Sequence, residues 1–208
     1  LERERPAAVA QAAPEKESAL AGIVTGHPDM LRLLDVVRKV AASDLLVLLQ
    51  GETVTGKGLF ARAIHDLSHR AGRKYLAINC AAIPEALLES ELFGHVRGSF
   101  TGAYGDKKGL LAEAAGGTVF LDEIGKLPLG MQGKILLFLD SMTIRPVGSN
   151  VDQVIDVRII CATKSDLKAK VASGEFLEDL YYRLLDFPLA VPPLRDRRED
   201  IEPIAASM

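Results

Sequence analysis

The feature that most constrains this chain is an apolar run that leads through a glycine-framed loop into a helical sequence. Leu45–Leu49 is followed by GETVTGKG and then by LFARAIHDL. In a strand–loop–helix of this kind, backbone N–H groups surround a phosphate, the helix N-terminus adds positive potential and the lysine reaches the outer phosphates. The pattern predicts a phosphate-binding loop made of Gly51, Glu52, Thr53, Val54, Thr55, Gly56, Lys57 and Gly58.

A second segment supplies the acidic half of such a site. The sequence GGTVFLDE places Asp122 and Glu123 directly after an apolar strand. In a nucleotide-hydrolysing site of this type, we expect Asp122 to bind Mg²⁺ and Glu123 to polarise the attacking water. An apolar strand that ends in two acids is a weak signal alone. The phosphate loop earlier in the chain makes it persuasive.

The remaining sequence alternates between short apolar runs and helical periods. The predicted strands are Leu45–Leu49, Tyr75–Asn79, Thr118–Asp122, Val157–Ala162 and Phe187–Val191. One predicted helix begins near Pro28, and the others cover Lys57–Leu67, Glu85–Leu92, Leu129–Asp140 and Leu177–Leu185. This alternation predicts an α/β fold with a mostly parallel five-stranded sheet between helices. Aromatic residues are 5% of the chain and Trp is absent, so the core must be aliphatic, as suits a sheet buried on both faces.

Two segments depart from this alternation. Thr143–Asp156 resembles a hairpin inserted between two β–α units, with Ser149 and Asn150 near its tip. Residues 1–22 mix Ala, Glu, Arg and Pro without a sustained apolar period, which is typical of a linker. The ordered domain is therefore expected to cover residues 23–208.

Composition excludes several classes of protein. The chain has 25 Lys and Arg against 28 Asp and Glu, so no global basic field favours DNA binding by this chain. The longest apolar run is far below the roughly 20 residues that a membrane-spanning helix needs. No signal peptide is evident either, and we expect a cytoplasmic protein. Cys80 and Cys161 are isolated among apolar or small neighbours and are predicted to be buried, reduced thiols.

At several blocks the sequence resembles the central AAA+ ATPase domain of bacterial enhancer-binding proteins, which activate sigma-54 RNA polymerase. The most specific block is GSFTGA, which is similar to the GAFTGA signature of that family and is preceded by ESELFGH. Supporting blocks are INCAAIPEALLESELFGH, GGTVFLDEIGKLP, DVRIICAT and DLYYRLLDFPLAVPPLRDRREDI. The resemblance covers about Ile23 to Ile201 and implies a three-layer P-loop NTPase that uses ATP and Mg²⁺.

The resemblance also implies roles for individual residues. The loop that contacts the sigma factor is Gly98, Ser99, Phe100, Thr101, Gly102 and Ala103, and the tip of the hairpin matches a second such loop. Asn79 matches an asparagine that holds the catalytic glutamate, although a strand-end asparagine is more often a cap or turn residue. Arg183 matches an arginine finger that acts on a neighbouring subunit, although by itself it would be interpreted as a helix-face salt bridge. The full protein is expected to form a hexamer or heptamer.

Four residues depart from the family pattern around the nucleotide. Val54 replaces a glycine, and Gly58 stands where the family usually has Glu and other P-loop proteins have Ser or Thr. Lys164 replaces a sensor asparagine, and Leu177 replaces the first of two arginines that act on a neighbouring subunit. Two hypotheses therefore remain open. One is an ATPase that remodels sigma-54 polymerase. The other is a regulatory nucleotide-binding module with impaired hydrolysis, which acts by assembly or through another sigma factor or a signalling nucleotide.

A P-loop kinase or a small GTPase is a poor match. The sequence has no acceptor-substrate lid, and TKSD at residues 163–166 does not fit the guanine-reading motif. The helical lid and the DNA-binding domain of the family would follow residue 208, so we expect a fragment that associates weakly or stays monomeric.

Overall fold

The computed structural model describes Leu20 and residues 22–207, so nearly all of the expected linker at residues 1–22 lies outside the described residues. All five predicted strands are present and form one sheet in the order β2-β5-β8-β1-β9. Every strand pair in this sheet is parallel, which confirms the predicted α/β class. The strands are β1 (Val47–Gln50), β2 (Tyr75–Asn79), β5 (Thr118–Asp122), β8 (Arg158–Thr163) and β9 (Phe187–Ala190).

Some predicted boundaries were wrong by one or two residues. The first strand begins at Val47 instead of Leu45, because Val47 is the first residue with a partner in both β8 and β9. Leu45 is 47% exposed and precedes the sheet. Strand β8 similarly extends one residue further than predicted, to Thr163, which pairs with Gln50. Pairing partners, which an isolated apolar run does not reveal, set these boundaries.

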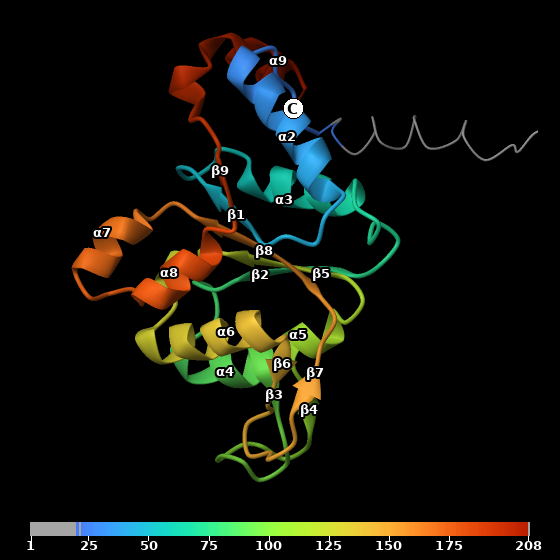
Figure 1. Cartoon of the computed structure of the whole chain (residues 1–208), viewed down its shortest axis with the longest axis vertical. Coiled ribbons are helices and arrows are strands. Elements are labelled where there is room, and N and C mark those ends of the chain that lie inside the picture. Colours follow the sequence, from blue (N-terminus) through green and yellow to red (C-terminus); the bar gives the residue numbers. More distant parts are fainter. Residues whose placement is uncertain (1–19, 21, 208) are drawn as a thin grey trace, which may run out of the picture.

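Helices cover both faces of the sheet (Figure 1). On one face lie α2 (Pro28–Ala41) and α3 (Lys57–Asp66), and on the other lie α4 (Glu85–Phe93), α5 (Leu110–Glu113), α6 (Leu129–Ser141) and α8 (Glu178–Leu184). The remaining elements are α7 (Leu167–Ala172), α9 (Ile201–Ala206) and the 3₁₀ turns η1 (Ile124–Lys126), η2 (Leu194–Asp196) and η3 (Arg198–Asp200).

The sheet separates two aliphatic clusters of buried side chains. The cluster under α2 and α3 includes Met30, Val37 and Ile64, and the larger cluster under α4 and α6 includes Leu92 and Ile135. In α2, apolar residues recur at helical spacing, so one face of the helix packs on the sheet and the other meets solvent. The predicted three-layer arrangement is therefore present.

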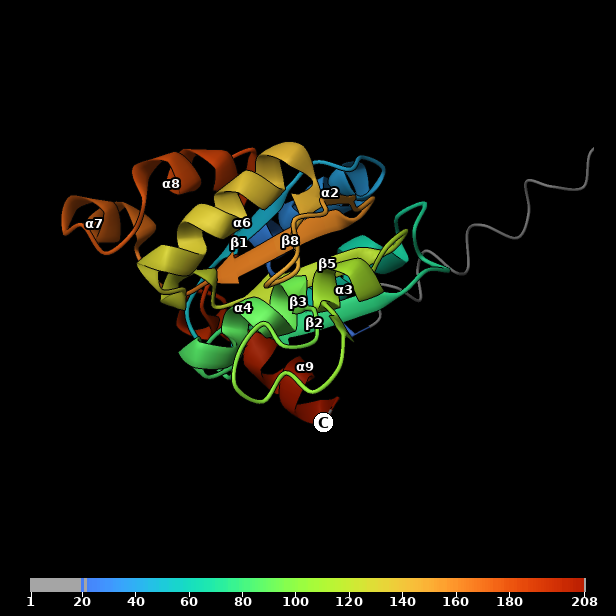
Figure 2. The same ribbon diagram turned by 90° about the horizontal axis from the view of Figure 1, so that it is seen from below.

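Two short antiparallel pairs lie at one end of the molecule, at the bottom of Figure 1. The predicted hairpin is present as β6 (Thr143–Ile144) and β7 (Gln153–Val154), whereas β3 (Gly94–His95) and β4 (Lys107–Lys108) were not predicted. The N–H of Val96 donates to the carbonyl of Val147, so the two pairs are joined. Figure 2 shows the connection between β3 and β4 as an open loop below α4 and α5.

Cys80 and Cys161 are both buried and unpaired, as predicted. Burial raises the pKa of the Cys80 thiol to about 12 and that of Cys161 further, so neither is a thiolate at neutral pH. Within the described part of the chain, no helix is both long and apolar enough to cross a bilayer.

Candidate nucleotide-binding site

The carboxyl ends of four parallel strands meet at one edge of the sheet. Gln50 pairs with Thr163, and Asn79 pairs with Asp122, so the segments that follow these strands start side by side. The N–H of Gly51 donates to the carbonyl of Thr163 over 3.2 Å. Ligands of open α/β sheets bind at this edge. The topology thus brings the predicted phosphate loop and the predicted acidic pair together.

The phosphate loop leads directly into the N-terminus of α3. Gly56 precedes the helix with φ +97°, a left-handed conformation that glycine adopts without strain. Lys57 is the first residue of α3 and is buried, and its Nζ donates to the carbonyl oxygens of Gly51 (2.9 Å) and Glu52 (2.7 Å). The lysine ammonium and the N-terminus of α3 therefore lie at one place, and this combination binds phosphate in proteins.

Val54 and Gly58, the two loop residues that depart from the family pattern, differ in backbone strain and in the space around them. Val54 has φ +65°, although a β-branched side chain resists that conformation. Its side chain is 94% exposed, so the backbone strain is not relieved by packing. Gly58 carries no hydroxyl, and an added Cβ there would meet nothing within 4 Å. The space at this position would admit a larger side chain, but this chain has glycine there.

Asp122 and Glu123 lie at the end of β5, at the same edge of the sheet as the phosphate loop. Asp122 Oδ1 accepts a hydrogen bond from the N–H of Glu123. Glu123 has φ +56° and one buried carboxylate oxygen, Oε2, that has no hydrogen-bond partner. The other oxygen, Oε1, lies 3.4 Å from Nζ of Lys164, which follows β8. The sequence identified Lys164 as unusual, and the structure adds its contact with the predicted catalytic base.

Asn79 and Arg183 have intramolecular partners here. Asn79 Oδ1 accepts from the N–H of Ala81, in the turn after β2. Arg183 donates to Asp140, to Asp186 and to the carbonyl of Leu139. The proposed roles of both residues depend on a bound nucleotide or a neighbouring subunit, and they stay predictions.

Leu177, the fourth departure, immediately precedes α8 and is partly buried. It packs against the larger core cluster, and its N–H donates to Oε1 of Gln132. The helix begins at Glu178, one residue after the predicted start. In this chain Leu177 therefore helps to hold the start of α8 against α6.

Two arginines from the C-terminal segment, Arg195 and Arg197, bond to the phosphate loop. The sequence alone assigned neither of them a role. Arg195 forms a two-bond ion pair with the carboxylate of Glu52, at 2.6 and 2.7 Å, which keeps the pKa of Glu52 below its usual value. The buried Arg197 donates to the carbonyl of Thr55 over 3.0 Å. Both lie more than 140 residues from the loop in sequence, so only the fold reveals the contacts.

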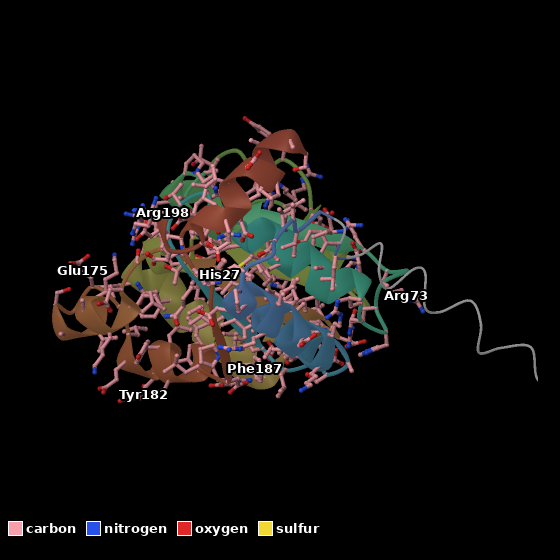
Figure 3. The ribbon with its side chains drawn as sticks, turned by 90° about the horizontal axis from the view of Figure 1, so that it is seen from above. His27, Arg73, Glu175, Tyr182, Phe187 and Arg198 are labelled. Carbon is pink, nitrogen blue, oxygen red and sulfur yellow. The ribbon has the colours of Figure 1, made fainter. Side chains whose placement is uncertain are left out.

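A small cavity adjoins the phosphate loop. Its volume is about 150 Å³, and its apolar lining includes Ile23, Leu59 and Ile204, with Arg197 beside them. Figure 3 shows His27, at the start of α2, beside the C-terminal segment, whereas Glu175 and Tyr182 lie on the side of α7 and α8. The cavity thus lies where α2, α3 and the C-terminal segment meet. A larger groove of about 500 Å³, between α4, α6 and the β6–β7 hairpin, lies away from the phosphate loop.

The donor set around Asp122 is suited to a magnesium ion held largely by phosphates and water. Within the described residues, no cluster of three or more His, Cys, Asp or Glu could hold a metal by itself. Mg²⁺ is commonly bound through one or two carboxylates together with substrate phosphates. Asp122 can provide that carboxylate, and neither Gly58 nor Thr55, whose hydroxyl donates to the Glu52 carbonyl, provides a free hydroxyl.

The predicted sigma-factor loop lies between β3 and β4. Thr101 and Gly102 are exposed, and Phe100 is 39% exposed with its ring edge-on to His95, 4.9 Å between centroids. Ser99 packs close to Gly148 of the hairpin. The two loops are therefore in contact through Ser99 and Gly148.

Residues 23–190 match the profile of the Sigma-54 interaction domain. The chain belongs to this family. Among curated relatives of this sigma-54 interaction domain, the transcriptional regulatory protein GlrR of Escherichia coli (strain K12) is 55% identical over 183 residues, which are 88% of this chain and 41% of GlrR. The Nif-specific regulatory protein of Azorhizobium caulinodans is 46% identical over 205 residues, 99% of this chain and 33% of that protein. The chain spans less than half the length of either relative.

Solved structures agree with the predicted P-loop NTPase fold. NtrX from Brucella abortus in complex with ADP superposes with a TM-score of 0.81 at 35% identity, over 92% of this chain and 43% of NtrX. The complex of NtrX with ATP gives a TM-score of 0.79 at 35% identity, over 92% of this chain and 44% of NtrX. The P-loop NTPase domain of the Sigma-54 transport activator from E. coli, at 18% identity and a TM-score of 0.53 over 81% of this chain and 99% of that chain, supports the fold alone.

Proposed function

We propose that this sigma-54 interaction domain binds ATP with Mg²⁺ between the phosphate loop and the end of β5. The observation that carries the proposal is the joint position of Lys57, the N-terminus of α3 and the acidic pair at one edge of the sheet. Binding of ADP and ATP by NtrX supports it. The apolar cavity beside Leu59 and Ile204 is suited to part of a base or sugar.

In this proposal each residue has a separate task. Lys57 gives up its carbonyl partners to neutralise the outer phosphates, and Asp122 binds Mg²⁺. Glu123 accepts the proton of the attacking water, and Asn79 orients Glu123. Arg183 leaves Asp140 to stabilise charge on the phosphoryl group in a neighbouring subunit, where a finger of this kind contributes about 10³–10⁵ in rate.

We also propose that the loop from Gly98 to Ala103 transmits nucleotide state to sigma-54 RNA polymerase. Phe100 is one large apolar side chain on a glycine-flanked tip and is partly exposed. A loop of this kind can move as a unit and present its ring to a partner. DNA contact and assembly into a hexamer or heptamer would belong to the full protein.

The alternative function is a nucleotide-binding regulator with slow or conditional hydrolysis. The specific observation in its favour is the ion pair between Lys164 and Glu123, together with the missing hydroxyl at Gly58. Phosphate release measured against protein concentration separates the two functions. An ATPase with a shared site gains specific activity as the concentration rises, and the regulator does not.

The binding site is tested with two variants and one control. Lys57→Ala should lower the affinity for ADP and ATP at least a hundredfold by calorimetry, because it removes the ammonium at the phosphates. Glu123→Gln should retain binding and stop hydrolysis. Lys168→Ala, at an exposed position of α7, is the matched control and should bind as the parent does. Equal affinity in Lys57→Ala and the parent would refute the site.

A further inference from the structure

The lysine after β8 lies between the two halves of the nucleotide site. Strand β8 is paired with β1 on one side and with β5 on the other, so Lys164 follows the strand that separates the phosphate loop from Glu123. The hydrogen bond from the Gly51 N–H to the Thr163 carbonyl fixes this spacing. A lysine here can reach Glu123 or a phosphate above the loop, because its four-carbon side chain is flexible.

In the structure the ammonium of Lys164 forms an ion pair with the carboxylate of Glu123. Its Nζ lies 3.4 Å from Oε1 of Glu123, and no other basic side chain of the described residues forms an ion pair with that carboxylate. The Glu123 side chain is only 15% exposed, so little water solvates it, whereas the Lys164 side chain is 43% exposed and free to move. An ammonium at this distance competes with water for the carboxylate oxygen that a general base must offer.

We propose that Lys164 is a positioning residue that holds Glu123 out of reaction and is drawn away by the terminal phosphate of a bound triphosphate. The proposal rests on the proposed nucleotide site. It assigns to one side chain both the restraint on hydrolysis and a preference for a triphosphate over a diphosphate. No bond forms or breaks in this exchange, since one ammonium changes between two anionic partners.

The first test compares a hydrolysis-resistant ATP analogue with ADP by calorimetry. Lys164→Met should weaken binding of the analogue about tenfold, the effect of losing one charge-assisted contact, and should leave ADP affinity within about twofold. Lys164→Arg should restore the preference, because it restores the charge. Lys168→Met, four residues further along, is the matched control and should bind both ligands as the parent does.

The second test asks whether the lysine leaves Glu123 on binding. Glu123→Gln should tighten binding of the analogue more in the parent than in Lys164→Met, by a factor of about two to five, because only the parent must break an ion pair. If the lysine stayed on Glu123, the gain would be the same in both backgrounds. Equal gains, or equal loss of ADP and analogue in Lys164→Met, overturn the proposal.

These outcomes are distinct from failure of the proposed function. If the parent protein bound neither ADP nor the analogue, the nucleotide site itself would be wrong. If it bound both but Lys164→Met did not discriminate between them, the site would stand and the role of Lys164 would fall. Thermal unfolding of each variant without ligand confirms that it is folded.

Discussion

His65 is a buried titratable side chain on α3 that the nucleotide site does not use. It is 1% exposed, and its Nδ1 lies 2.9 Å from the hydroxyl of Thr118 in β5. Burial lowers the pKa of His65 below its usual 6.5, because a charged imidazole would lose its solvation there. The neutral ring is therefore part of the interface between α3 and the sheet.

This histidine should make stability dependent on pH. Because its folded pKa is lowered, its contribution is complete above about pH 6.5 and is lost as the pH falls through the folded pKa. We expect the melting temperature of the parent to fall between pH 7.5 and pH 5 more than that of His65→Gln. Calorimetric melting at several pH values measures this. Parallel curves for the two proteins would contradict the assignment.

Arg158 is a fully buried side chain that donates hydrogen bonds to the C-terminal end of α2. Its two Nη atoms donate to the carbonyls of Val40 and Ala41, each over 2.9 Å, at the C-terminus of α2. Burial lowers the pKa of Arg158 to about 10, so it remains charged at neutral pH. The contact gives the Ala41 carbonyl a charged donor and adds one to the Val40 carbonyl, which also accepts from the N–H and the hydroxyl of Ser43.

Loss of this arginine should destabilise the fold. Arg158→Met should lower the free energy of unfolding by about 2–4 kcal/mol, because two buried carbonyls lose charged donors. Arg62→Met, which removes an exposed pair with Asp66, is the control and should cost about 1 kcal/mol or less. Urea unfolding measures both variants, and equal losses would show that burial of Arg158 adds nothing.

At the scale of elements, the segment that contains η2 and η3 is fastened to the phosphate loop. Arg197 is buried, bonds to the carbonyl of Thr55 and lies 3.8 Å from Asp200. Asp200 in turn accepts from the hydroxyl of Thr25 and the N–H of Gly26. One chain of contacts thus joins both edges of the cavity beside the loop.

This fastening should affect nucleotide binding as well as stability. Arg197→Ala should cost about 1.5–3 kcal/mol of unfolding free energy and should weaken ADP binding, because the loop carbonyl loses its anchor. Arg198→Ala, the next residue and an exposed one, is the control and should change neither. Urea unfolding and calorimetry with ADP measure the two effects. Unchanged ADP affinity in a folded Arg197→Ala protein would show that the loop holds its shape alone.

The two loops at the far end of the molecule meet at a glycine. Gly148 has φ +79°, and an added Cβ would lie 2.6 Å from Cβ of Ser99. Gly174 has nearly the same conformation, φ +73°, with nothing within 4 Å of an added Cβ. Alanine at either position would strain the backbone, but only alanine at Gly148 would also disturb the contact between the loops.

Alanine at the two positions should have different effects. Both variants should lose about 1–2 kcal/mol of unfolding free energy from the left-handed backbone, and Gly148→Ala should lose more because Ser99 must move. Only Gly148→Ala should increase protease cleavage within residues 98–103. Equal cleavage in both variants would show that the contact does not hold the loop.

At the scale of the whole molecule, Arg183 lies on α8 and the phosphate loop precedes α3. Arg183 is paired with Asp140 and Asp186 on the side of α6 and α8. In the proposed function Arg183 acts on the nucleotide of a neighbouring subunit. Activity of mixed variants is the observation that tests a shared site.

Mixing two inactive variants should recover activity. Lys57→Ala removes the phosphate lysine and Arg183→Ala removes the finger, so each alone should hydrolyse ATP slowly. An equimolar mixture should recover part of the parent rate, because some interfaces combine an intact loop with an intact finger. Arg62→Ala is a control and should keep the parent rate. A mixture no faster than the separate variants would refute a shared site.

The sequence by itself determined the parallel α/β sheet, the strand–loop–helix that carries Gly51–Gly58 and the acidic pair at the end of β5. Each depends on neighbouring residues, such as an apolar run with a turn or a helix start after it. The tertiary structure alone decided the strand order, the contacts of Arg195 and Arg197 with the loop, and the ion pair of Lys164 with Glu123. These join residues distant in sequence, because sheet register and the burial of each face determine which side chains meet.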